Sequence, residues 1–275
     1  MKNEGHTCYP KTPLFEPCPF VPVTHNIATP CPAANVGIRM SDFAELLDVL
    51  YEDNHVIAVN KPAGWPSAHF DGEDETVDRL VKSYLKEKYA KPGKVYLGVV
   101  HRLDKPTSGV LLFARTSKAA ARLCEQFREG AVEKVYWAIA QSANAFEKPW
   151  GTLEDWLFHD DAERRVLVVP PDTLNAKLAR THYQVKARHD GWIWLELTPQ
   201  TGRKHQLRVQ LASRGAPITG DKKYGSHTTL GESIALHARR ATFLHPTKTE
   251  PIVLTADVPK VWRGRFAHLL NAGGV

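Results

Sequence analysis

The sequence predicts an α+β fold, and two observations carry that prediction. Segments rich in β-branched and aromatic residues, typical of strands, are interspersed with segments whose apolar residues recur at helical spacing. Their order shows no regular strand–helix–strand repeat, which disfavours an all-parallel α/β sheet. With 275 residues, 43% of them hydrophobic, the chain can bury a large core and is neither fibrous nor wholly disordered in composition.

Residues 1–40 are predicted to form an extended or disordered arm. They hold seven of the 19 prolines and show neither helical nor strand periodicity. Such a segment cannot bury enough apolar surface to offset the entropy that is lost on ordering. We therefore expect the folded domain to comprise residues 41–275.

The first elements of that domain follow from capping residues and apolar spacing. Residues 56–59 predict a short buried strand, and residues 76–89 predict a helix that follows an acidic loop. A further loop leads into the apolar segment 95–100. Before these elements, Ser41 can cap a short helix, whose apolar residues at helical spacing are Phe43, Leu46, Leu47 and Leu50.

The later elements show clearer boundaries. Residues 109–114 predict a strand, and residues 117–129 predict a helix with Gly130 just past its end. Two more strands are expected at 135–140 and 192–198, where Trp192 and Trp194 are predicted to be core or sheet residues rather than a base-stacking platform. Residues 204–213 predict a helix that Gly215 closes, with Leu207 and Leu211 facing inward.

Charge is distributed unevenly along the chain. Residues 1–100 carry 10 Lys and Arg against 13 Asp and Glu, whereas residues 101–275 carry 26 against 17. A basic region of this size favours a polyanionic partner such as nucleic acid, because Lys and Arg neutralise phosphates. On charge alone, a solvated surface with a basic surplus remains the alternative.

Several classes of protein are disfavoured. The longest apolar stretches, such as 110–114, fall far short of the roughly 20 residues that span a bilayer, and the N-terminus has no apolar signal region. We therefore expect a soluble cytoplasmic protein. Cys8, Cys18 and Cys31 lack C-x-x-C spacing, which argues against a zinc site. The sequence contains no Walker, dinucleotide or G-x-S-x-G motif.

The loop His101-Arg102-Leu103-Asp104-Lys105-Pro106-Thr107-Ser108-Gly109 carries the most chemistry. It places an Arg, an Asp, two hydroxyl groups and a Gly between two apolar strand candidates. Loops held by rigid strands often carry catalytic groups. The alternative from the residues alone is a turn in which Asp104 and Thr107 hydrogen-bond to local backbone.

This loop resembles the signature loop of the RluA-type RNA pseudouridine synthases. Other segments resemble that family in the same order: NKPAG at 60–64, KVYWA at 134–138, TGRKHQLR at 201–208, GDKKYG at 220–225 and LHA at 236–238. The resemblance extends from about residue 49 to residue 259. It implies the pseudouridine synthase fold, in which helices and loops flank a mixed, largely antiparallel central sheet.

The resemblance also implies roles for individual residues. Asp104 matches the catalytic nucleophile, Tyr136 the tyrosine that stacks on the target base, and Arg208 the residue that pairs with the aspartate. Arg102 matches the arginine that fills the space left by the flipped nucleotide. Further contacts to substrate are expected from the remaining motif residues His101, Thr107, Arg203, Lys204, His205, Leu207 and Lys61. An outer wall that holds the RNA backbone is expected from Arg214, Lys222, Lys223, His237, Arg239 and Arg240.

The implied activity is isomerisation of uridine to pseudouridine in ribosomal or transfer RNA, after the target base is flipped out of its stack. The reaction needs an ionised aspartate beside the base, and we expect no metal and no cofactor. RNA is the expected partner of a monomeric enzyme that makes no membrane contact. Two alternatives remain open: a non-catalytic RNA-binding protein on the same scaffold, and a glycosylase that uses Asp104 to release the base.

Overall fold

The computed structural model describes residues 47–68, 75–141 and 145–273. The chain divides into two units, 1–37 and 38–275, and all described residues belong to the second. The predicted arm at 1–40 and the predicted cap Ser41 lie outside the described residues. Within the described ranges, no helix combines the length and the apolar character needed to cross a membrane.

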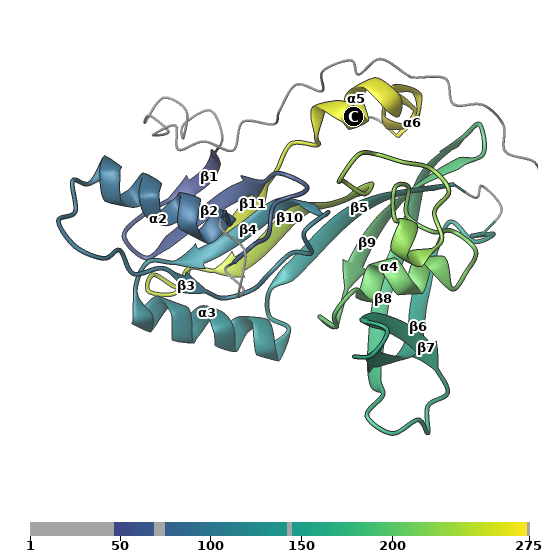
Figure 1. Ribbon diagram of the computed structural model, residues 1–275, viewed down its shortest axis with the longest axis horizontal. Helices are drawn as coiled ribbons and strands as arrows, with labels where there is room; N and C mark the ends of the chain where they lie inside the picture. Colours follow the sequence, from purple (N-terminus) through teal and green to yellow (C-terminus); the bar gives the residue numbers. More distant parts are fainter. Residues whose placement is uncertain (1–46, 69–74, 142–144, 274–275) are drawn as a thin grey trace, which may run out of the picture. The chain divides into compact units, whose positions relative to one another are not determined.

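The strands of the described region form one sheet (Figure 1). Its main path runs β1-β2-β4-β10-β5-β9-β8-β6-β7, while β3 pairs with β4 and β11 pairs with β10. Of the described strand pairs only β4–β10 is parallel, which confirms the mixed, largely antiparallel sheet. The strands are β1 (Asp48–Glu52), β2 (Val56–Lys61), β3 (Gly98–Val99), β4 (Ser108–Ala114), β5 (Glu133–Gln141), β6 (Trp150–Asp160), β7 (Arg165–Val169), β8 (Lys177–His189), β9 (Trp192–Pro199), β10 (Leu236–Leu244) and β11 (Pro251–Thr255).

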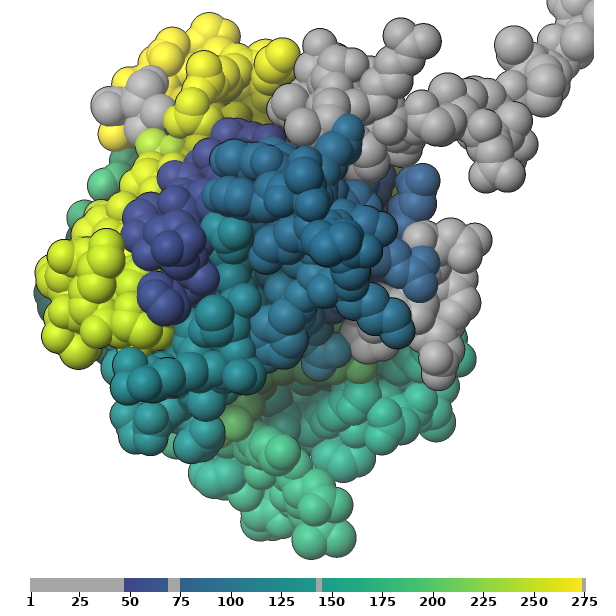
Figure 2. Space-filling view, turned by 90° about the vertical axis from the view of Figure 1, so that its left-hand side faces the viewer, coloured from purple at the N-terminus to yellow at the C-terminus, as the bar shows by residue number. Residues whose placement is uncertain are grey.

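In the half of the sheet that contains β2 and β4, helices cover both faces. Alternate residues of a strand point to opposite faces: Val56 and Val110 pack with α3 (Ser117–Glu129), and Ile57 and Leu111 pack with α2 (Val77–Lys88). In Figure 2 the residues of α2, in blue, lie at the surface of the molecule. Because helices cover both faces, every residue of β4 is buried.

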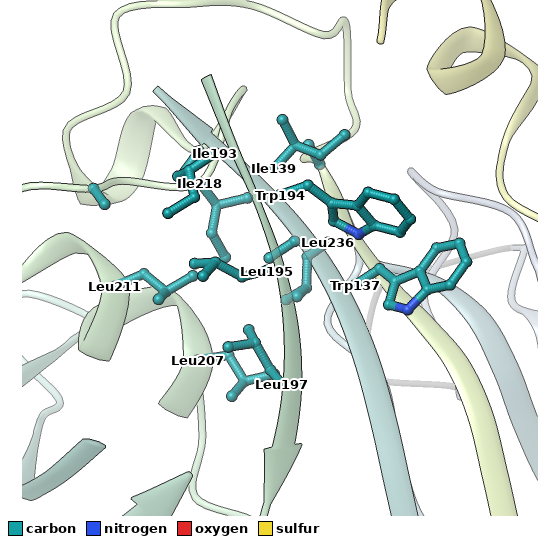
Figure 3. Close-up of a cluster of buried hydrophobic side chains, with 14 of the residues drawn as sticks. Trp137, Ile139, Ile193, Trp194, Leu195, Leu197, Leu207, Leu211, Ile218 and Leu236 are labelled. Carbon is teal, nitrogen blue, oxygen red and sulfur yellow. The ribbon is translucent and has the colours of Figure 1, made fainter. Parts of the chain in front are cut away.

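In the other half, β5 and β9 also bury both faces. On one face, Leu195 and Leu197 pack against Leu207 and Leu211 of α4 (Gln206–Ala212) (Figure 3). On the opposite face, Trp194 is fully buried, which confirms that it belongs to the core. The described C-terminal helices α5 (Lys260–Arg265) and α6 (Ala267–Ala272) supply further residues to this cluster.

The structure confirms several predicted elements and overturns one. The helix predicted at 117–129 has the predicted bounds: Thr116 caps it by accepting a hydrogen bond from the Ala119 amide (3.1 Å), and Gly130 ends it in the left-handed conformation. The helix predicted to start at Ser41 does not extend through Leu50, and its residues before Leu47 lie outside the described residues. Residues Asp48–Glu52 form β1 instead, because pairing with β2 outweighs helical spacing in so short a segment.

Candidate active site

Asp104 lies in the loop between β3 and β4, and the backbone of that loop is held from several sides. The buried Ser67 hydroxyl donates to the carbonyl of Leu103 (2.7 Å) and accepts from its amide (2.9 Å). The Thr107 amide donates to the Asp104 carbonyl (3.0 Å). A fixed backbone limits where the Asp104 carboxylate can move.

Lys61 supports the same loop from the end of β2. Its fully buried ammonium donates to the carbonyls of Pro62 (2.9 Å), Trp65 (2.6 Å) and Lys105 (3.1 Å). Burial lowers the pKa of Lys61 to about 7, although the negative charge of Asp104 opposes that shift. The structure thus gives Lys61 contacts with loop backbone.

Gly109 allows the loop to enter the sheet beside β10. Its φ of +114° is one that other residues rarely adopt, and a Cβ there would overlap the carbonyl oxygen of Ala238. Only glycine permits two backbones to approach this closely. The start of β4 is therefore fixed against the centre of the sheet.

Arg208 connects Asp104 to a second carboxylate. Its Nη1 donates to Asp104 Oδ2 (3.0 Å), while Nε and Nη2 donate to the two oxygens of Asp221 (2.7 and 2.8 Å). Arg208 and Asp221 are buried, whereas the Asp104 side chain is 28% exposed. The two carboxylates raise the pKa of the guanidinium against the effect of burial, so Arg208 stays charged beside Asp104.

His205 stands at the start of α4 in a left-handed conformation (φ +52°), with Nε2 3.8 Å from Asp104 Oδ2. Its Nδ1 lies 2.7 Å from the hydroxyl of Tyr224, and that oxygen accepts from the Val166 amide (3.1 Å). Burial lowers the pKa of His205 to about 4, with further lowering by neighbouring cations such as Arg208. In this neutral ring the Tyr224 hydroxyl donates to Nδ1, which leaves the proton on Nε2, facing Asp104.

Tyr136 approaches the site from β5. Its side chain lies on the α4 face of the sheet, because it pairs with Leu197 and alternates with Trp137 on the opposite face. Burial and the charge of Asp104 both raise the pKa of the Tyr136 phenol well above its ordinary range. The ring is therefore neutral and offers a flat face for a base.

These groups line a cleft of about 920 Å³. The predicted catalytic and substrate-contact residues line this cleft, with the exception of Lys61. The first and the last of them, His101 and Arg208, are 107 positions apart in the sequence. His101 stacks on Phe127 (ring centroids 4.6 Å apart) and accepts from the Leu112 amide. The residues that the structure brings together here are His101, Arg102, Asp104, Thr107, Tyr136, Arg203, Lys204, His205, Leu207 and Arg208.

Some predicted contacts to RNA have other partners in the structure. His237 is fully buried: its Nε2 donates to the Ala256 carbonyl (3.1 Å), and its Nδ1 accepts from Ser108 Oγ (2.9 Å). The expectation that His237 belongs to an outer RNA wall is therefore wrong. Arg214 pairs with Asp155 (2.9 Å) and Arg240 pairs with Glu133 (3.1 Å).

Three residues that shape the site have no role that the sequence predicts. Asp221 and Tyr224 lie in the segment GDKKYG, which resembles the family. The motif therefore marks this segment, but it does not indicate what the two side chains do. Ser67 lies in no motif, and only its contact with Leu103 reveals it. Within the described ranges, no cluster of three or more His, Cys, Asp or Glu residues could hold a metal ion.

Comparisons with known proteins agree with the motifs. The sequence model of the RNA pseudouridylate synthase family matches residues 55–213. An uncharacterised RNA pseudouridine synthase of Bacillus subtilis (strain 168) is 37% identical over 78% of this chain and 69% of the relative. A ribosomal large subunit pseudouridine synthase D of Xylella fastidiosa is 36% identical over 78% of this chain and 66% of the relative.

A tRNA pseudouridine synthase C of Vibrio cholerae is 31% identical over 81% of this chain and 96% of the relative. Among solved structures, human RNA pseudouridylate synthase domain containing 4 superposes with a TM-score of 0.67 at 26% identity, over 85% of this chain and 94% of that one. The family match over more than half of the chain, the relatives and the shared fold agree with one another. The chain is an RNA pseudouridine synthase that belongs to the RluA-type family.

Proposed function

We propose that the chain converts uridine in ribosomal or transfer RNA into pseudouridine with Asp104 as the nucleophile. The observation that carries this proposal is the position of the Asp104 carboxylate, which Arg208 binds in a cleft that Tyr136 also lines. Ribosomal RNA is named in the description of the Xylella fastidiosa relative, and transfer RNA in that of the Vibrio cholerae relative. The basic surplus of residues 101–275 suits such a polyanion.

The chemistry needs nothing beyond the RNA and the chain. The bond between ribose C1′ and uracil N1 breaks, a bond from C1′ to C5 of the same base forms, and the hydrogen on C5 leaves as a proton while N1 gains one. Asp104 supplies the electron pair that stabilises or attacks the electron-poor centre during this exchange. Both Arg208 and His205 approach Asp104 Oδ2, which leaves Oδ1 to face the substrate.

The base must leave its stack to reach Asp104. Extrusion costs a few kcal/mol, and the cleft supplies two compensating groups. Tyr136 stacks on the flipped uracil, and the exposed Arg102, two residues before Asp104, fills the vacated position in the RNA with a planar cation. Both side chains line the cleft.

Release of tritium from RNA labelled at carbon 5 of uridine tests the proposal. Wild-type protein is expected to release tritium from ribosomal or transfer RNA transcripts, and Asp104→Asn is expected to abolish release while RNA binding persists, because phosphate contacts remain. RNA binding without release by the wild type would favour the binding-only alternative. Free uracil with an abasic site would indicate a glycosylase instead.

A further inference from the structure

Lys134 lies on β5 two residues before Tyr136. Residues at this spacing share one face of a strand and stand about 7 Å apart. Both side chains line the cleft described above. Lys134 therefore points into the space beside the position proposed for the flipped base.

The half-buried ammonium of Lys134 lacks a counter-ion. Across residues 47–68, 75–141 and 145–273, no ion pair or hydrogen bond to its Nζ is present. The adjacent Glu133 faces the opposite side of the strand and pairs with Arg240 (3.1 Å). Glu129 lines the same cleft, yet it lies outside ion-pair distance of Lys134.

The neighbours of Lys134 do not neutralise its charge. Burial and the charge of Lys134 lower the pKa of His101 to about 3, so the stacked ring of His101 is neutral. The end of α3 is also capped: the carbonyls of Gln126 and Phe127 accept from the amides of Ala131 and Gly130. These carbonyls have partners already, and Lys134 is not needed to satisfy them.

A cation that has lost part of its hydration without gaining a partner is costly, and burial lowers the pKa of Lys134 accordingly. An anionic ligand would remove that cost. The anions that accompany any RNA into this cleft are its backbone phosphates.

We propose that Lys134 forms an anion subsite of the cleft and binds a backbone phosphate of the RNA next to the nucleotide held between Asp104 and Tyr136. This subsite rests on the proposed function for the identity of its ligand. It positions the RNA strand, and it takes no part in bond making or breaking. Because its partner is a phosphate, it contributes equally to every RNA sequence.

The salt dependence of binding tests the subsite. Affinities of wild type, Lys134→Gln and Lys134→Arg for transfer and ribosomal RNA transcripts are measured from about 50 to about 200 mM salt. Loss of one phosphate contact reduces the slope of log Kd against log salt by about 0.7 to 0.9, and weakens binding by about tenfold at low salt. Lys134→Arg keeps the charge and is expected to retain most of the slope.

Lys118 provides the matched control. It is an exposed lysine on α3 outside the cleft wall, so Lys118→Gln removes the same charge without changing the slope. Thermal unfolding of each variant verifies that it is folded. Should Lys134→Gln fail to fold, reductive methylation of the wild-type protein decides the question, since bound RNA is expected to protect Lys134 and to leave Lys118 reactive.

Kinetics separate this subsite from the proposed function. In the tritium assay Lys134→Gln is expected to raise KM and to leave kcat near that of the wild type. An unchanged slope in Lys134→Gln, or methylation of Lys134 unaffected by RNA, would overturn the subsite even if tritium release is normal. A reduced slope in a protein that releases no tritium would instead support the subsite and refute the proposed activity.

Discussion

Asp221 fixes the orientation of Arg208 by a two-point ion pair, with Nε 2.7 Å from one carboxylate oxygen and Nη2 2.8 Å from the other. This geometry leaves Nη1 directed at Asp104, 3.0 Å away. Planar, bidentate pairing of this kind restricts a guanidinium far more than a single contact does. Asp221 therefore positions the proposed nucleophile through Arg208, without touching the cleft itself.

The first prediction follows from this pair. Asp221→Asn keeps one acceptor oxygen but removes the charge that orients Arg208, and a displacement of the catalytic group by about 1 Å can cost about a hundredfold in rate. We expect kcat in the tritium assay to fall by that order. Asp155→Asn is the matched control, because it deprives Arg214 of its partner (2.9 Å) outside the cleft and should reduce stability alone. Equal kcat values for both variants would show that Asp221 has no positioning role.

The second prediction separates the two properties of Tyr136. Tyr136→Phe keeps the flat ring on the α4 face of β5 and removes only the hydroxyl, whereas Tyr136→Ala removes both. If stacking on the flipped base contributes about 1–3 kcal/mol, Tyr136→Ala should lose about 5- to 150-fold more activity than Tyr136→Phe. Single-turnover tritium release measures both rates. Identical defects would assign the whole role to the hydroxyl.

The third prediction concerns stability in acid. The pKa values of His101, His205 and His237 are lowered from 6.5 to about 3, 4 and 4, first of all by burial. The unfolded chain therefore binds protons more readily than the folded chain as the pH falls below 6.5. The stability that the folded chain gains by holding these three histidines neutral is complete above about pH 6.5, and it is lost progressively toward pH 4. Thermal unfolding followed between these pH values should show a falling midpoint.

Substitution identifies the source of that pH dependence. His237→Gln removes one of these three rings and should flatten the decline between pH 6.5 and pH 4. His227 is an exposed loop residue, and His227→Gln should leave the curve of the wild type unchanged. A midpoint that is constant over the whole range would contradict the assignment.

The fourth prediction concerns the close approach at Gly109. In Gly109→Ala the new Cβ would meet the Ala238 backbone, whose nitrogen lies 2.6 Å from the ideal Cβ position, and the left-handed φ adds strain. We expect a large loss of stability, in the range of several kcal/mol typical of overpacking combined with strain. Gly93→Ala meets no atom within 4 Å and serves as the control. Denaturant unfolding of the two variants provides the comparison.

The sequence predicts best those elements whose signals are local. The helix at 117–129 has both bounds correct, because Thr116 caps its start and Gly130 ends it within the segment itself. The apolar strands β2 and β4 are equally clear, since helices cover both of their faces and leave long runs of buried residues. Motifs predict ten of the residues that line the cleft, because a motif records chemistry independently of the fold.

Elements that depend on distant partners escape prediction. β8 alternates poorly in polarity, with exposed and half-buried residues along most of its length, and its strand state comes from pairing with β6 and β9. The helix at 204–213 begins two residues late, because His205 adopts a left-handed conformation beside Tyr224. The positioning role of Asp221 cannot be predicted from the sequence, because it depends on Arg208 lying between the carboxylates of Asp221 and Asp104.

The position of β10 between β4 and β5 has a consequence for the order in which the active site can assemble during synthesis. Asp104 precedes β4 and Tyr136 lies on β5, so both are translated long before residues 236–244, which join their strands. A nascent chain that ends before β10 contains every proposed catalytic side chain and yet has no strand between the two halves of the sheet. Domains acquire such non-local pairings late. We therefore expect the cleft to assemble only after residues 236–244 have left the ribosome.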